Sequence, residues 1–99
     1  MKRQFKMKSI SDIRTQQATK IAKRLLNHWK HKFDVANTED HYEIFMPSAT
    51  VSLSPKENLL HVEIDFKTDD VDQIRLEQVV IDHLVRMGQE ELNAEWSHS

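Results

Sequence analysis

Three histidines have the residue type and spacing that a metal site requires. His28 and His31 are three residues apart in a segment expected to be helical, so their imidazoles would project to one side. His83 lies inside an apolar stripe of a second expected helix. Imidazole nitrogens are common ligands of zinc and other transition metals. One hypothesis is therefore a metal or haem site formed by His28, His31 and His83, and no cofactor beyond such a metal is predicted.

A structural role for the same histidines is the interpretation that we favour. A histidine near a helix end can cap free carbonyl groups and interact with the negative end of the helix dipole. A buried imidazole, as expected for His83, needs hydrogen-bond partners, for which Glu90 and His28 are the candidates. An H-x-x-H pair without a neighbouring cysteine or carboxylate is a weak metal signal, so the ligand role is the alternative.

Arg86 and Glu90 are four residues apart in the expected final helix and could pair there. An exposed pair of this kind contributes only about 0.3–0.5 kcal/mol. If Arg86 instead faces an empty cleft, its guanidinium could bind a carboxylate or phosphate with two hydrogen bonds. A small enzyme with His83 as acid or base and Arg86 as anion clamp is a third hypothesis. It ranks lowest because the chain has no nucleophile elbow, phosphate loop, H-E-x-x-H or dinucleotide fingerprint.

The polar face of the expected sheet carries a second group of titratable side chains. His61, Glu63 and Asp65 alternate with apolar residues along one strand, and His41 and Glu43 do so along an earlier one. If these strands are neighbours, the surface is acidic and could bind a cation. Such a face is far more often the solvated side of an antiparallel sheet, which is the interpretation we favour.

Composition limits the class of protein. The chain has 99 residues, a formal net charge of −2 and no cysteine. Near-balanced charge gives no field for nucleic acid, and the basic cluster in residues 2–8 reads as a solvated arm. Without cysteine there is no disulfide or thiol chemistry, and no apolar run marks a signal peptide or a membrane span. We expect a cytoplasmic protein that binds neither nucleic acid nor membrane.

Apolar periodicity predicts one domain over residues 1–99, with an arm over 1–9 and a globular core over 10–96. A short strand at 10–14 precedes a helix that Thr15 would cap. Alternating residues predict strands at 41–46, 49–53 and 60–66, joined by turns at 47–48 and 54–58. A long helix capped by Thr68 or Asp69 follows, running to Trp96. The expected fold is α+β: a two-layer sandwich with an antiparallel sheet of three or four strands and both helices on one face, in the order (β)-α-β-β-β-α.

The final helix shows two apolar stripes, whereas a surface helix needs only one. One stripe includes Ile74, Ile81 and Leu92. The other lies on roughly the opposite side and includes His83. Two stripes imply that the helix is covered on both sides, by the first helix or by a second subunit. The second alternative predicts a homodimer through Leu76, Val79, Val80 and Met87.

Two sequence boxes resemble a bacterial family known as domain of unknown function 2218. Residues 28–33 read H-W-K-H-K-F, and residues 83–87 read H-L-V-R-M, followed by E-E-L at 90–92 and Trp96. The likeness extends from about Ser11 to Trp96. Met87 replaces a usual phenylalanine, and Gln89 replaces a common arginine, which puts a salt bridge from that position in doubt. Pro47-Ser48 occupies a turn where the family often has glycine.

The resemblance implies an architecture and a context, but no reaction. The family is similar in expected fold to the small α+β domain that closes phosphohexomutases, although fold alone does not carry function. Some members resemble segments that accompany siderophore-interacting reductases, which implies iron handling. The favoured prediction is a small non-enzymatic binding or accessory domain in an iron or siderophore context.

Overall fold

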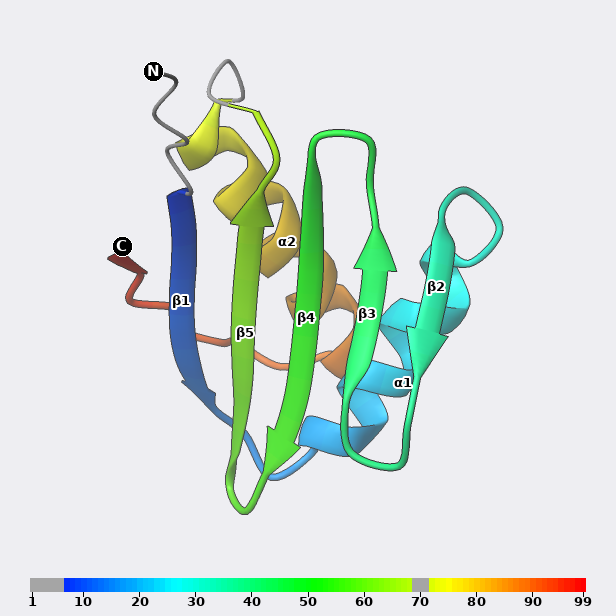
Figure 1. Cartoon of the computed structure of the whole chain (residues 1–99). Helices are drawn as coiled ribbons and strands as arrows, with labels where there is room; N and C mark the ends of the chain where they lie inside the picture. Colours follow the sequence, from blue (N-terminus) through cyan, green and yellow to red (C-terminus); the bar gives the residue numbers. More distant parts are fainter. Residues whose placement is uncertain (1–6, 69–71) are drawn as a thin grey trace.

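The computed structural model describes residues 7–68 and 72–99 and consists of a six-stranded sheet with two helices. Figure 1 shows both helices on the same side of the sheet. The elements in chain order are β1 (Met7–Arg14), α1 (Ala18–Trp29), β2 (Asp34–Asn37), β3 (Tyr42–Phe45), β4 (Ala49–Lys56), β5 (Leu59–Phe66), α2 (Gln73–Gly88) and β6 (Ser97–His98).

The sheet is antiparallel throughout, in the order β2-β3-β4-β5-β1-β6. The predicted α+β class is confirmed, but the predicted three or four strands and the order (β)-α-β-β-β-α are wrong, because the observed order is β-α-β-β-β-β-α-β. Two short edge strands, β2 and β6, were missed. Strand β2 has a single large apolar side chain, Val35, and β6 has only two residues, so neither carries a readable alternation. Both are held by backbone pairing, β2 to β3 and β6 to the longer β1.

The three central strands have the faces that their alternation predicts. On β5, Leu60, Val62, Ile64 and Phe66 are buried, and the residues between them are half-buried. The buried positions of β3 and β4 continue this layer beneath the helices. Strand β4 is longer than expected, because Pro55 and Lys56 pair with β5 and leave only Glu57 and Asn58 in the turn.

Strand β1 begins at Met7, so residues 7–9 belong to the sheet and not to the expected arm. Residues 1–6, with the rest of the basic cluster, lie outside the described residues. On β1, Ser9, Ser11 and Ile13 are buried, whereas Asp12 and Arg14 are exposed. Two of these three buried side chains are serines, so the first residues of this strand lack the apolar alternation that predicts a strand.

Helix α1 buries one stripe against the sheet, which includes Ile21, Leu25 and Trp29. Its N-cap residue is Gln17, without a side-chain cap, so Thr15 is not the cap that we predicted. The Thr15 hydroxyl instead accepts a hydrogen bond from the Gln17 backbone N–H, a local turn just before the helix. The helix ends at Trp29, and Phe33 packs edge-on against that indole.

Helix α2 starts at a cap formed by Asp72, whose carboxylate accepts from the Arg75 backbone N–H. Thr68 is therefore not the cap, and Asp69 lies outside the described residues. The helix ends at Gly88, because Gln89 turns left-handed with φ 52°. The predicted extension to Trp96 is wrong. Leu92 and Trp96 do pack against the core, but from an extended tail that crosses behind the sheet to β6 (Figure 1).

Candidate functional site

The two sequence boxes meet at a shallow hollow between α1 and α2. The hollow has a volume of about 480 Å³. We call it the helix groove, and it is lined by Arg24, Asn27, His28, His31, Arg86 and Met87. His28 and His31 come from the first box, and Arg86 and Met87 come from the second. Two guanidinium groups and two imidazoles thus line one surface, with no carboxylate among the lining residues.

His83 lies beside the helix groove and joins the two helices. Its ring is half-buried and packs on Trp29, with 4.8 Å between ring centroids, and on His28, with 5.5 Å. Its Nδ1 lies 2.7 Å from the backbone oxygen of Val79, and only a protonated nitrogen can donate to that oxygen. In the neutral imidazole, Nε2 is then the nitrogen with a free lone pair.

The structure brings two of the three predicted metal ligands together. The rings of His28 and His83 are neighbours, whereas His31 lies in the turn after α1, which ends at Trp29. Within residues 7–68 and 72–99, no group of three or more His, Asp or Glu side chains is placed to hold a metal ion. The helical His28–His31 geometry that we expected is not formed, and metal binding stays a prediction.

The predicted Arg86–Glu90 helical pair is wrong, because α2 ends before Glu90. The Glu90 carboxylate turns instead to the start of α1. In the described part of the chain, Arg86 has no hydrogen-bond or ion-pair partner. Arg24 is different: its Nη1 donates to the Met87 backbone oxygen at 3.0 Å, so it caps the end of α2. Arg86 is therefore the cation of the helix groove that remains available.

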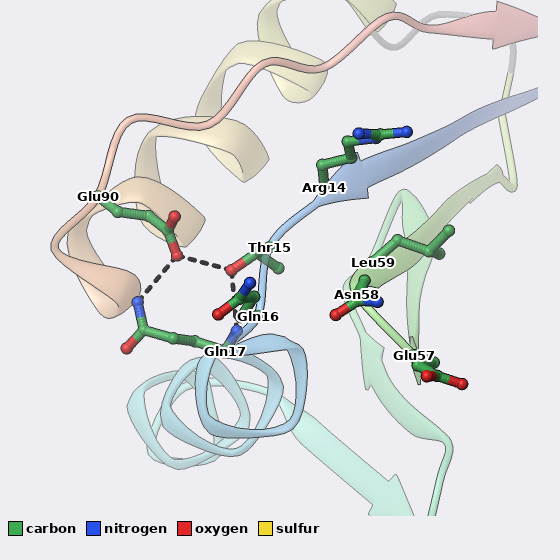
Figure 2. A pocket seen from close by; sticks show the side chains of 8 residues that line it. All are labelled: Arg14, Thr15, Gln16, Gln17, Glu57, Asn58, Leu59 and Glu90. Atoms are coloured by element: carbon green, nitrogen blue, oxygen red, sulfur yellow. Dashed lines mark hydrogen bonds between the residues drawn. The ribbon is translucent and has the colours of Figure 1, made fainter.

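A second and larger depression lies where β1 leads into α1, with a volume of about 780 Å³ (Figure 2). We call it the β1–α1 pocket. Glu90 Oε1 accepts hydrogen bonds from Thr15 Oγ1 at 2.6 Å and from Gln17 Nε2 at 2.8 Å. Both hydrogen bonds lower the pKa of Glu90 below its ordinary value, and the bond from Thr15 has the larger effect. Residues Arg14, Glu57 and Asn58 also line this pocket.

The polar sheet face carries a small charge network centred on His61. Its Nδ1 contacts Asp12 on β1, and its Nε2 contacts Glu63 at 2.8 Å. Glu63 also pairs with Lys8 at 3.3 Å. Strand β4 separates β3 from β5, so His41 and Glu43 are not on a strand next to His61, as the cation-surface hypothesis required.

Burial of the His61 ring is the largest single influence on its pKa and acts to lower it. The hydrogen bonds and charges of Asp12 and Glu63 together outweigh that burial, so the pKa of His61 is raised above 6.5. The hydrogen bond from His61 lowers the pKa of Glu63, and the hydrogen bond and charge of Lys8 lower it further. This network fits a solvated sheet face on which opposite charges are paired across strands.

The residues predicted to form a dimer divide into two groups. Val80 is fully buried in the core and offers no surface to a partner. Leu76, Val79 and Met87 are half-buried at the core's edge. A homodimer through these three remains a proposal, and sedimentation that shows only monomer at high concentration would contradict it.

Comparison with known proteins places the chain in a family. A family model described as an uncharacterized protein conserved in bacteria, domain of unknown function 2218, matches residues 10–97. The chain belongs to this family. The expected resemblance is thereby confirmed. A comparison with curated proteins gives no match.

One solved structure supports the fold of this member of family 2218. The chain is similar to PA4090 from Pseudomonas aeruginosa, whose structure was determined by NMR, with 29% sequence identity and a TM-score of 0.75. The similarity covers 92% of this chain and 95% of the other. Among the described helices, none is both long and apolar enough to cross a membrane.

Sequence reasoning missed the β1–α1 pocket. Thr15 and Gln17 are separated from Glu90 by more than 70 residues, and no motif links them. The one sequence feature that could have indicated it is Gly88, because glycine is common at helix ends. With α2 ending at Gly88, Glu90 lies outside the helix.

Proposed function

We propose that this chain is a non-enzymatic binding domain that receives a carboxylate- or phosphate-bearing ligand in the helix groove. The observation that carries the proposal is Arg86, which lines the open groove while its expected partner, Glu90, is held elsewhere. A guanidinium presents a planar fork of N–H donors that suits both carboxylate and phosphate oxygens.

The rest of the groove supports an anionic ligand. His28 and His31 add imidazoles, whose ring N–H groups can donate hydrogen bonds to an anion, and Asn27 adds a side-chain amide. A hollow this shallow, between two packed helices, fits a small anionic group better than an extended substrate. The lining has no hydroxyl or carboxylate nucleophile, which supports binding rather than covalent catalysis.

An iron or siderophore context and a cytoplasmic location belong to this proposal as well. The context is supported by the resemblance of some family members to segments that accompany siderophore-interacting reductases. Many iron chelators present carboxylate or other anionic oxygen groups, which would suit Arg86. The location is supported by the absence of cysteine, which is typical of proteins from reducing compartments.

Amide chemical shifts measured during ligand titration test the proposal. We expect citrate and inorganic phosphate to shift the amide signals of His28, His31 and Arg86, and glycerol to leave them unchanged. The shifts should weaken as salt rises, because the groove is partly exposed and its charges are screened. Equal shifts with glycerol, or shifts confined to other surfaces, would contradict anion binding in the groove.

Metal binding is a second candidate that one specific observation favours. A histidine that ligates a metal usually donates its other ring N–H to a carboxylate or a backbone carbonyl. His83 has this arrangement, because Nδ1 is committed to the Val79 oxygen and His28 lies beside the ring. Native mass spectrometry of protein purified without a tag or added metal tests it. A metal mass lost in both His28→Ala and His83→Ala would support the site, and a metal-free mass would contradict it.

A further inference from the structure

The β1–α1 pocket has a volume of about 780 Å³, and its lining carries charges of both signs. Glu57 and Glu90 contribute carboxylates, and Arg14 contributes a guanidinium. Figure 2 shows Glu90 on the α2 side of the β1–α1 connection and Asn58 on the side of the β4–β5 turn. The pocket is thus built from three separate parts of the fold and not from one loop.

Glu90 is held so that one of its oxygens stays free. Both hydrogen bonds from Thr15 and Gln17 go to Oε1, whereas Oε2 has no partner in the described part of the chain. Thr15 is only 6% exposed, and Gln17 Nε2 is fixed a second time by the Gly88 oxygen at 3.2 Å. The carboxylate is therefore oriented before any ligand arrives, which reduces the entropy lost on binding.

The turn opposite Glu90 is also fixed. Asn58 adopts a left-handed φ of 64°, a conformation that asparagine tolerates better than most residues. Its backbone oxygen accepts a hydrogen bond from the Thr15 backbone N–H at 3.2 Å. This bond ties the β4–β5 turn to the connection that leads into α1, so the two sides of the pocket keep their separation.

We propose that the β1–α1 pocket binds a small zwitterion whose ammonium group contacts Glu90 and whose carboxylate contacts Arg14. Ammonium is a donor-only group and suits the free Oε2 of Glu90, and a carboxylate suits the guanidinium fork. Neither Arg14 nor Glu57 has a side-chain partner among the described residues, so both charges are available to a ligand. This site is separate from the helix groove and does not depend on the function proposed for it.

Three matched probes test the charge requirement: 4-aminobutyrate, butylamine and butyrate. We expect 4-aminobutyrate to shift the amide signals of Thr15, Gln17 and Asn58 and to bind at least about tenfold more tightly than either single-charge probe. The signals of His28 and Arg86 should stay in place, which separates this site from the helix groove. No shift at the pocket with 4-aminobutyrate, or equal binding of all three probes, would overturn the proposal.

Two variants test the assigned contacts. Glu90→Gln keeps an oxygen for Thr15 and Gln17 but removes the charge, and we expect 4-aminobutyrate to bind about tenfold more weakly. Arg14→Gln should weaken it by a similar factor, and this exposed change keeps the proposal testable if Glu90→Gln does not fold. Glu39→Gln and Arg75→Gln are matched controls on exposed residues outside the pocket. Unchanged binding in Arg14→Gln, or equal weakening in the controls, would contradict the assigned contacts.

Discussion

The imidazole of His83 packs on the indole of Trp29, with 4.8 Å between ring centroids and 44° between ring planes. This contact links the two sequence boxes directly, because Trp29 ends α1 and His83 lies in α2. It fixes how the two helices meet, and so it sets the shape of the helix groove beside it. His83 thus connects the two helices beside the groove.

His83→Ala is expected to destabilise the fold by roughly 1–3 kcal/mol, because it removes the ring packing and the hydrogen bond to the Val79 oxygen. His31→Ala is the matched control, since His31 is exposed and has no hydrogen bond or aromatic-ring contact in the described part of the chain. Its effect should stay within about 0.5 kcal/mol. Urea unfolding of both variants makes the comparison, and equal losses would contradict this role for His83.

Gly88 is needed because α1 approaches α2 closely at this point. A Cβ at residue 88 would lie 2.8 Å from Ile21 Cδ1 and 3.0 Å from Cγ1, and Ile21 is fully buried. We expect Gly88→Ala to cost roughly 1–3 kcal/mol from overpacking, although alanine favours the helix by about 1 kcal/mol. Adding Ile21→Val removes Cδ1 and should recover part of the loss. A Gly88→Ala protein as stable as the parent would show that the helices can move apart freely.

Only one of the two buried serines on β1 should lose stability on truncation to alanine. Ser11 Oγ has no hydrogen-bond partner in the described part of the chain, so Ser11→Ala should be neutral or stabilise by up to about 1 kcal/mol. Ser9 Oγ donates to the buried Glu77 carboxylate at 2.6 Å and accepts from Gln73. Ser9→Ala should therefore cost about 1–3 kcal/mol. Thermal unfolding of the Ser9→Ala and Ser11→Ala variants tests this difference. Equal effects of the two changes on stability would contradict these hydrogen-bond assignments.

The His61 network predicts a pH window for stability. Since the pKa of His61 is raised in the folded state, its contribution is complete below pH 6.5 and is lost as the pH rises through the raised pKa. The pKa of Glu63 is lowered, so its contribution is complete above pH 4.5 and is lost as the pH falls through the lowered pKa. The network thus supports the fold most strongly between about these two values.

His61→Gln is the variant that tests this window. It should flatten the decline in stability that the parent shows as the pH rises above 6.5, because glutamine does not titrate. His31→Gln is a suitable control, since it removes an exposed histidine outside the network. Unfolding free energies measured from pH 5 to 8 give the comparison. A parent that becomes more stable over this rise, with His61→Gln unchanged, would show that the sign is wrong.

The central sheet and both helices could be predicted because their side chains alternate or repeat with clear periods. Leu60 to Phe66 alternate strictly, and Ile21, Leu25 and Trp29 follow one helix face. The edge strands could not be predicted, because Ser97 and His98 are held by backbone pairing to β1 and carry no apolar pattern.

The end of α2 was predicted too late in the chain, and the reason is physical. Leu92 continues the apolar spacing of the helix, yet it reaches the core from an extended tail. The site prediction failed at the same point. Arg86 and Glu90 are four residues apart in sequence, but the left-handed turn at Gln89 sends them to different surfaces. Of the two hydrogen-bond partners predicted for His83, His28 lies beside its ring and Glu90 does not, whereas the hydrogen bond itself goes to the Val79 oxygen. The contacts of Glu90 depend on long-range packing alone.

Titration calorimetry with citrate on the parent, Arg86→Gln and Arg75→Gln tests the central claim most directly. Arg86 lines the helix groove and Arg75 is an exposed α2 residue that does not, so the two changes remove the same charge at different places. We predict measurable binding to the parent, a loss of at least about tenfold in Arg86→Gln and no change in Arg75→Gln. Equal affinity of the parent and Arg86→Gln for citrate would contradict an anion site in the helix groove.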